Sequence, residues 1–242
     1  MTNLQDQFSS VDNTGAKRLY LQIADKLAQL ISDGIIKPGE RLPAERELAS
    51  RYDVSRQTVR EALIALEVSG IVAIRPSSGI YVLKKSTLSP ALITEDAPGP
   101  LEIMEARRLL EGQACEMAAS RISNEELRKL QAYIEQMSVL VGKQDLTGAE
   151  QFDGRFHRLI AHATRNSAIY TMVDWLWTLR DSSEISRLFA EKMRRHGANP
   201  NIEAHQAIYE NLCRRDGDGA RQAMESHLKH VEDMFIIMIG DA

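Results

Sequence analysis

The stretch LPAERELASRYDVSRQTVREALIALE, residues 42–67, constrains the fold of this 242-residue chain more than any other. Its pattern predicts two short helices joined by a tight turn. Ser55 stands where a helix N-cap accepts hydrogen bonds from the amides of the first turn. Val59, Leu63 and Leu66 then recur at helical spacing and predict a buried face. A helix-turn-helix is therefore expected here.

The N-terminal end of the second predicted helix carries Arg56, Gln57 and Arg60. In the major groove of DNA, Arg forks onto guanine and Gln onto adenine, while other Arg side chains hold phosphates. A helix face that is merely charged and solvated would carry the same residue types. This motif alone leaves both interpretations open.

The flanking residues favour DNA binding. Apolar residues at near-helical spacing predict a helix over 18–32, and two β-type runs, 71–74 and 80–83, predict a hairpin. Three helices followed by a two-stranded hairpin make a winged helix-turn-helix. Residues 17–85 carry twelve Lys and Arg against eight Asp and Glu, whereas the rest of the chain is acidic. This asymmetry fits a chain that takes nucleic acid at one end.

The motifs LPAERELA, VSRQTVREAL and LEVSGIV, together with the hairpin, resemble the DNA-binding domain of the GntR family of bacterial transcription regulators over residues 17–83. The wing departs from the family's usual Arg-x-Gly-x-Gly, because Ser77 replaces the first glycine. That change puts the wing's detailed contact with DNA in question. By the resemblance, the residues that contact double-stranded operator DNA are Arg41, Arg46, Ser55, Arg56, Gln57, Thr58, Arg60 and Arg75.

Composition divides the chain into four parts: a disordered lead-in over 1–16, the winged helix over 17–85, a Ser/Pro-rich linker over 86–99 and an all-α bundle over 100–242. Ser123 to Glu126 form a capping box, and one uninterrupted helix is expected over 167–193. The expected fold is thus mainly α. A polar start and the lack of a membrane-length apolar run predict a cytoplasmic protein.

The predicted bundle contains one constellation of metal-ligand type. Asp153 and His157 lie four residues apart, so a helix would place them on one face. His205 and His227 fall among apolar residues of two further helices. A surface ion pair would explain Asp153 and His157 equally well. Three buried histidines and a carboxylate would all need polar partners, however, and one divalent ion would serve all four.

This spacing, in an all-helical second domain, resembles the FCD effector domain of the FadR subfamily. Within that subfamily, the motifs GPLEIMEARRLLEGQACEMAA, HATRNSAI and LWTLR resemble the repressors of hexuronate catabolism. The resemblance implies that the four residues hold a metal ion at a ligand pocket. Three imidazoles with one carboxylate favour Zn²⁺, with Ni²⁺, Mn²⁺ and Fe²⁺ as alternatives. The resemblance to the hexuronate repressors also implies that Arg107, Trp177 and Arg180 contact the effector.

The sequence therefore predicts a homodimeric transcription regulator, a repressor rather than an activator, controlled by a small carboxylate or sugar acid. Dimerisation is expected because paired modules read symmetric half-sites. Two rivals stay open: a regulator for which the metal ion is itself the signal, and a metal-dependent enzyme. A closed structural zinc site is a further alternative for the metal.

Overall fold

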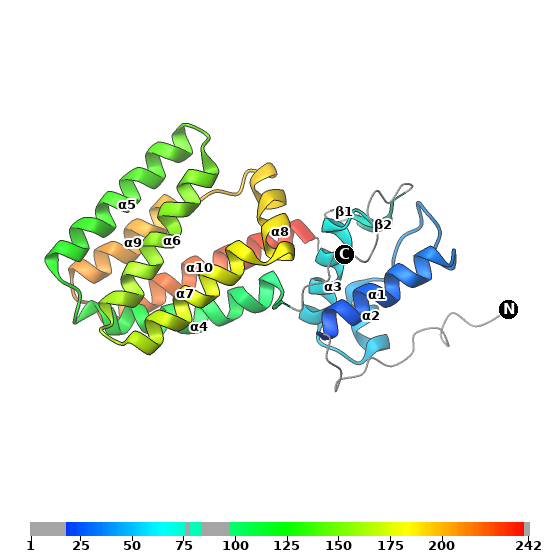
Figure 1. The fold of residues 1–242 in the computed structure, drawn as a ribbon, viewed down its shortest axis with the longest axis horizontal. Coiled ribbons are helices and arrows are strands. Elements are labelled where there is room, and N and C mark those ends of the chain that lie inside the picture. Colours follow the sequence, from blue (N-terminus) through cyan, green and yellow to red (C-terminus); the bar gives the residue numbers. More distant parts are fainter. Residues whose placement is uncertain (1–17, 76–77, 84–96, 240–242) are drawn as a thin grey trace. The chain divides into compact units, whose positions relative to one another are not determined.

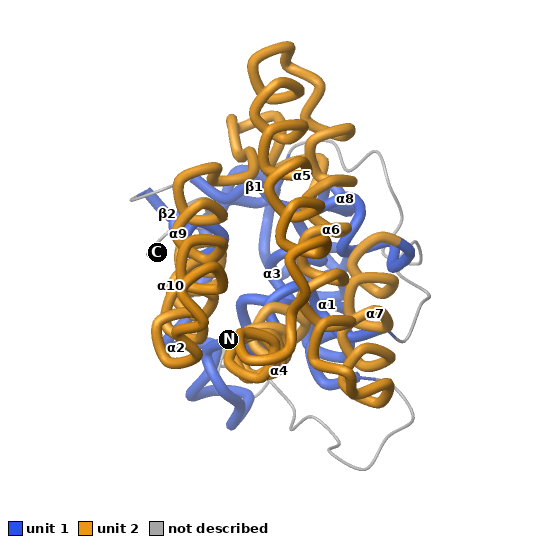
Figure 2. Tube along the Cα trace, turned by 90° about the vertical axis from the view of Figure 1, so that its left-hand side faces the viewer, with its two compact units in different colours: residues 1–101, 182–189, 234–242 blue, residues 102–181, 190–233 orange. Residues whose placement is uncertain are grey.

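The computed structural model describes residues 18–75, 78–83 and 97–239, and these divide into two compact units (Figures 1 and 2). Unit 1 comprises the described residues of 1–101, 182–189 and 234–242, and unit 2 comprises 102–181 and 190–233. The predicted lead-in, residues 86–96 of the predicted linker and Ser77 of the wing lie outside the described residues. Within the described residues, no helix is long and apolar enough to cross a membrane.

Unit 1 contains the predicted winged helix-turn-helix. Its elements are α1 (Leu19–Ser32), α2 (Glu45–Tyr52), α3 (Arg56–Val68), β1 (Val72–Arg75) and β2 (Gly79–Val82). The two strands pair antiparallel, with Val72 opposite Val82 and Arg75 opposite Gly79. Helix α3 packs against α1, α2 and β1, so it forms the centre of this unit (Figure 1). The predicted fold class is confirmed here.

Local sequence signals explain the geometry of the helix-turn-helix. Asp53 ends α2 in the left-handed conformation, with a φ of 53°, and Asp is among the residues that tolerate it best. Ser55 then caps α3, because its hydroxyl accepts a hydrogen bond of 3.0 Å from the amide of Thr58. Val59 and Leu63 are fully buried behind this cap. The two helices are thus fixed by a short turn and a shared core.

The chain re-enters the described residues at Ala97, which packs within unit 1. The hydroxyl of Tyr20 donates to the carbonyl of Ala97 at 2.9 Å, and the amide of Leu101 donates to the carboxylate of Glu61 at 2.7 Å. Ala97 and Leu101 are both buried. The end of the predicted linker and the first residues of the next helix therefore belong to the core of the DNA-binding unit.

The rest of the described chain is helical, as predicted. The helices, in order, are α4 (Pro100–Ala119), α5 (Asn124–Gly142), α6 (Leu146–Ala163), α7 (Ser167–Ser182), α8 (Glu184–Arg195), α9 (Ile202–Cys213) and α10 (Gly217–Ile239). Helix α5 packs against α6 and α9 (Figure 1). Side-chain caps fix the starts of α6 and α9: Asp145 accepts from Gly148, and Asn201 accepts from Ala204.

The prediction of one helix over 167–193 is wrong, because α7 ends at Ser182 and α8 begins at Glu184. Ser183 is buried between them. Its carbonyl accepts from the amide of Arg187 at 2.9 Å, and its hydroxyl from that of Ser186 at 3.5 Å. A serine that satisfies the amides of a following turn starts a new helix rather than continuing the old one.

The predicted capping box at α5 is present and is reinforced from a distant helix end. Ser123 accepts from the amide of Glu126, and the Glu126 carboxylate accepts from the amide of Ser123 at 2.9 Å. Arg165 contacts both oxygens of the same carboxylate, at 2.8 and 2.7 Å. Burial alone would raise the pKa of Glu126, but the hydrogen bonds from Arg165 and Ser123 lower it to about 2.

We expect Glu126→Gln to lower the free energy of unfolding at pH 7 by about 1–2 kcal/mol, because it weakens a cap and a charged pair. The folded pKa lies below the ordinary value of 4.5, so this stabilisation is present above pH 4.5 and is lost as the pH falls toward 2. Urea unfolding of both proteins across this range should show that the difference between their free energies of unfolding becomes smaller.

Glu125→Gln is the control, because exposed Glu125 pairs only with Lys129 one turn away in the described structure. A pH-independent difference would contradict the assignment.

Candidate metal centre and nucleic-acid interface

The four predicted metal ligands meet inside unit 2. Asp153 and His157 come from α6, His205 from α9 and His227 from α10. One ligand atom from each residue lies within 4.8 Å of the others. The three histidines are at most 4% exposed, and the Asp153 side chain is 15% exposed. The surface ion-pair interpretation of Asp153 and His157 therefore does not describe this site.

Hydrogen-bond acceptors surround two of these imidazoles on both sides. His205 places Nδ1 2.7 Å from the carbonyl oxygen of Asn201 and Nε2 2.7 Å from Oδ1 of Asp153. His157 contacts a Glu111 oxygen through Nδ1, and its Nε2 lies 3.4 Å from the same Asp153 oxygen. A neutral imidazole carries only one N–H. Each ring therefore needs an additional cation, either a second proton or a metal ion, between Nε2 and Asp153.

Two imidazole nitrogen atoms of this cluster lack hydrogen-bond partners in the described structure. Nε2 of His157 and Nδ1 of His227 are buried and have no hydrogen-bond partner within the described residues. Burial, and then the charges of His205 and His157, hold the pKa of His227 well below its usual value, so its ring is neutral at pH 7. Neutral imidazole is the form that binds a metal ion. The donor set fits a divalent cation.

Glu111 on α4 is a further part of the site that the sequence analysis did not identify. It is 2% exposed and contacts Nδ1 of His157, while Nε of Arg107 donates to its other oxygen at 2.6 Å. Burial would raise the pKa of Glu111, but Arg107 and His157 lower it to about 2. The only signal in the sequence was the spacing of Arg107 and Glu111, which places both on one helix face.

The three predicted effector residues lie together beside this cluster. The guanidinium carbon of Arg107 lies 3.9 Å from the centre of a Trp177 ring, and that of Arg180 lies 5.1 Å from it. The His157 ring is 5.2 Å from the same indole. Trp177 is fully buried, and its Nε1 has no hydrogen-bond partner within the described residues. Arg180 also pairs with Glu150 at 3.2 Å.

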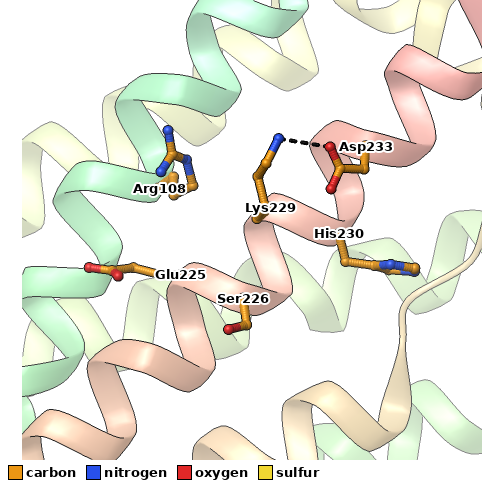
Figure 3. A pocket seen from close by; sticks show the side chains of 6 residues that line it. All are labelled: Arg108, Glu225, Ser226, Lys229, His230 and Asp233. Carbon is orange, nitrogen blue, oxygen red and sulfur yellow. Dashed lines mark hydrogen bonds and ion pairs between the residues drawn. The ribbon is translucent and has the colours of Figure 1, made fainter.

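Figure 3 shows a separate, open hollow on the surface of α4 and α10. It has a volume of about 400 Å³ and contains none of the predicted site residues; its lining residues are Arg108, Glu225, Ser226, Lys229, His230 and Asp233. Lys229 pairs with Asp233 at 2.7 Å, and Arg108 lies 3.6 Å from Glu232. Its cations are therefore compensated within the same surface, and we assign it no ligand.

The predicted DNA contacts lie at the start of α3, on α2 and at the hairpin. Arg46 and Arg56 are exposed, Gln57, Thr58 and Arg60 are half-buried, and the Ser55 hydroxyl lies 2.8 Å from that of Thr58. The Ser55 hydroxyl also accepts from the amide of Thr58, so it caps α3.

At the hairpin, the Arg75 guanidinium stacks on Tyr81 with 4.7 Å between its carbon and the ring centre. The Arg41 guanidinium packs over Gly79, where a Cβ would lie 2.3 Å from Nε of Arg41. Gly79 has a φ of +117°, and this backbone conformation favours glycine. The described part of the wing thus places the Arg41 and Arg75 guanidinium groups near the end of the strands where the hairpin turns.

Comparison with known proteins identifies both domains. Residues 19–82 match the family model "Bacterial regulatory proteins, gntR family", and residues 102–230 match the FCD domain. The Exu regulon transcriptional regulator of Escherichia coli K12 is 34% identical over 232 residues, covering 94% of this chain and 88% of that protein. The Uxu operon transcriptional regulator of the same organism is 34% identical over 233 residues, covering 92% and 89%.

Among solved structures, a GntR protein of Streptococcus agalactiae is similar, with a TM-score of 0.48 and 28% identity over 89% of this chain and 99% of that one. The family matches and the curated relatives agree with the resemblance seen in the sequence motifs. The chain belongs to the GntR family of bacterial transcription regulators, in the FadR subfamily with an FCD domain, and is not an enzyme.

Proposed function

We propose that this regulator is a homodimeric repressor that contains a divalent metal ion and releases operator DNA when a small carboxylate or sugar acid binds near that ion. The observation that carries the proposal is the buried cluster of Asp153, His157, His205 and His227, in which two imidazoles face acceptors at both nitrogens. A bound cation resolves this arrangement, and its charge would attract an anion beside three guanidinium groups, each of which also pairs with a carboxylate.

Zinc is the proposed ion, with Ni²⁺, Mn²⁺ and Fe²⁺ as alternatives. Zn²⁺ combines imidazole nitrogen with carboxylate oxygen, and three histidines with one aspartate suit it. When bound, the ion supplies a Lewis-acidic centre that attracts an anionic oxygen. The chain itself contributes the orientation of the ligands: the Asn201 carbonyl and the Glu111 carboxylate hold Nδ1–H of His205 and His157, so each ring directs its Nε2 lone pair toward Asp153.

The effector class rests on the residues around Trp177 and on the relatives. Arg107, Arg158 and Arg180 place their guanidinium carbons 3.9–5.5 Å from the centre of a Trp177 ring. A guanidinium recognises carboxylates, and the unpartnered Nε1–H of Trp177 suits a hydroxyl or carbonyl oxygen. The Exu and Uxu regulators are similar to this chain along most of its length, which favours a hexuronate.

The DNA-binding part of the proposal rests on the winged helix. The exposed side chains Arg46 and Arg56 and the half-buried Arg60 lie on the two helices of the helix-turn-helix. Two copies would read a pseudo-palindromic operator, because a single module contacts too few base pairs for useful specificity. Effector binding would shift the dimer between states of different operator affinity, and a tenfold change corresponds to about 1.4 kcal/mol.

The metal proposal predicts that Glu111→Gln weakens metal binding without preventing folding. The amide keeps the shape of the carboxylate but does not stabilise Nδ1–H of His157 as strongly, so we expect zinc affinity to fall about 10–100-fold. Competition with a fluorescent zinc chelator measures this directly. Glu105→Gln is the control, because Glu105 is exposed on the same helix. Equal affinities for wild type and Glu111→Gln would contradict the role given to Glu111.

The effector proposal predicts that glucuronate or galacturonate raises the Tm of the zinc-loaded protein by a few degrees at saturating concentration, since it binds only the folded state. Differential scanning fluorimetry against a panel of sugar acids and dicarboxylates is the measurement. His205→Ala should abolish the shift. If no acid shifts the Tm, and operator release in a fluorescence anisotropy assay follows zinc concentration alone, the ion is the signal and the effector proposal fails.

A further inference from the structure

One buried carboxylate in the winged helix has no role in the proposed function as stated above. Glu45 is the first residue of α2 and only 1% exposed, although it lies within the helix-turn-helix that is expected to face DNA. Acidic side chains are seldom buried unless they are paired. In a DNA-binding module a negative charge also opposes the attraction of phosphates. Its position therefore requires a reason other than affinity for DNA.

Glu45 contacts the arginines of α3. Nε of Arg60 lies 3.0 Å from one carboxylate oxygen and 2.9 Å from the other. Nη2 of Arg56 reaches the second oxygen at 3.4 Å. The Arg60 side chain is 14% exposed and that of Arg56 is 55% exposed. One acidic group on α2 thus holds two of the arginines that the proposed function assigns to DNA.

The fold stabilises the carboxylate independently of these contacts. Glu45 occupies the first turn of α2, where the unpaired amides and the helix dipole favour negative charge. The residue before it, Ala44, has no side chain that could cap the helix. Because α2 packs against α3, the position of the carboxylate is fixed relative to the start of α3. Its location is set by the core rather than by DNA.

We infer that Glu45 is a positioning residue that sets the operator specificity of this regulator by orienting Arg60, and to a smaller extent Arg56. The inference rests on the proposed DNA contacts. Both carboxylate oxygens of Glu45 accept from Nε of Arg60, and this fixes the direction of the guanidinium relative to α3. Guanidinium donors recognise O6 and N7 of guanine. A guanidinium held in this orientation before binding loses less conformational freedom when it meets the correct base.

The test compares Glu45→Gln with Glu47→Gln in the full-length protein. Both substitutions remove one negative charge from α2, but Glu47 is exposed and pairs with Arg51 on the same helix. The probes are a duplex selected by the wild-type protein from a randomised pool and a scrambled duplex of the same composition, in fluorescence anisotropy at fixed salt. We expect Glu45→Gln to reduce the ratio of the affinity for the selected duplex to that for the scrambled duplex about tenfold. Affinity for the scrambled duplex should stay equal or rise, and Glu47→Gln should leave the ratio unchanged.

A double-mutant cycle separates positioning from a loss of folding. In an Arg60→Ala background, Glu45→Gln should change the affinity ratio far less than in the wild type, because its main partner is already absent. Glu45→Asp keeps the charge but withdraws it by one methylene, and should give an intermediate ratio. It serves as the readout if Glu45→Gln does not fold, in which case an unchanged ratio for Glu45→Asp overturns the inference.

The outcomes distinguish the inference from the function on which it rests. If Glu45→Gln folds and keeps the wild-type ratio, or lowers both affinities equally, Glu45 does not orient Arg60 for specificity. If the two effects add fully in the cycle, the contact between Glu45 and Arg60 is structural and the inference fails. If the wild-type protein selects no common sequence from the pool, the proposed operator binding fails first, and the inference fails with it.

Discussion

A buried imidazole that faces hydrogen-bond acceptors at both nitrogens needs either a second proton or a metal ion. Unit 2 places two such rings around one carboxylate. His205 lies between the Asn201 carbonyl and Asp153, and His157 lies between Glu111 and Asp153. These side chains come from α4, α6 and α9, and Asn201 is the N-cap residue of α9. Without a cation, acceptors would oppose one another in a site that water does not screen. The core of this unit is thus arranged around charge as much as around apolar packing.

Buried carboxylates orient cationic groups at other points of the molecule as well. Glu111 holds Arg107 and His157, Glu45 holds Arg60, and Glu126 combines a helix cap with a contact to Arg165. Each of these acids is at most 7% exposed. In each case the carboxylate is fixed by a helix, and the longer, more flexible cation is held in one orientation. A binding site requires side chains that are held in one geometry by such supporting contacts.

The sequence predicted features that depend on neighbouring residues and missed those that depend on distant ones. The capping box at Ser123 and the helical spacing of Asp153 and His157 are local patterns, and both have the expected form in the structure. The four predicted metal ligands were joined by family resemblance as much as by spacing, since they lie on three different helices. Glu45 and Glu111 looked like ordinary charged helix residues, because their partners lie 15 and 46 positions away. The break at Ser183 falls in residues 180–184, RDSSE, which contain neither Gly nor Pro, so the sequence has no strong helix-stop signal there.

The central claim is that one divalent ion binds Nε2 of His157 and His205 together with His227 and Asp153. X-ray absorption spectroscopy of the purified protein loaded with one equivalent of zinc tests it most directly. The account predicts a first shell of nitrogen and oxygen at about 2.0–2.1 Å, with the outer-shell scattering typical of imidazole and no sulfur. It also predicts that His205→Ala loses part of that imidazole scattering. A shell of water oxygens alone, or a spectrum that His205→Ala leaves unchanged, would contradict the account.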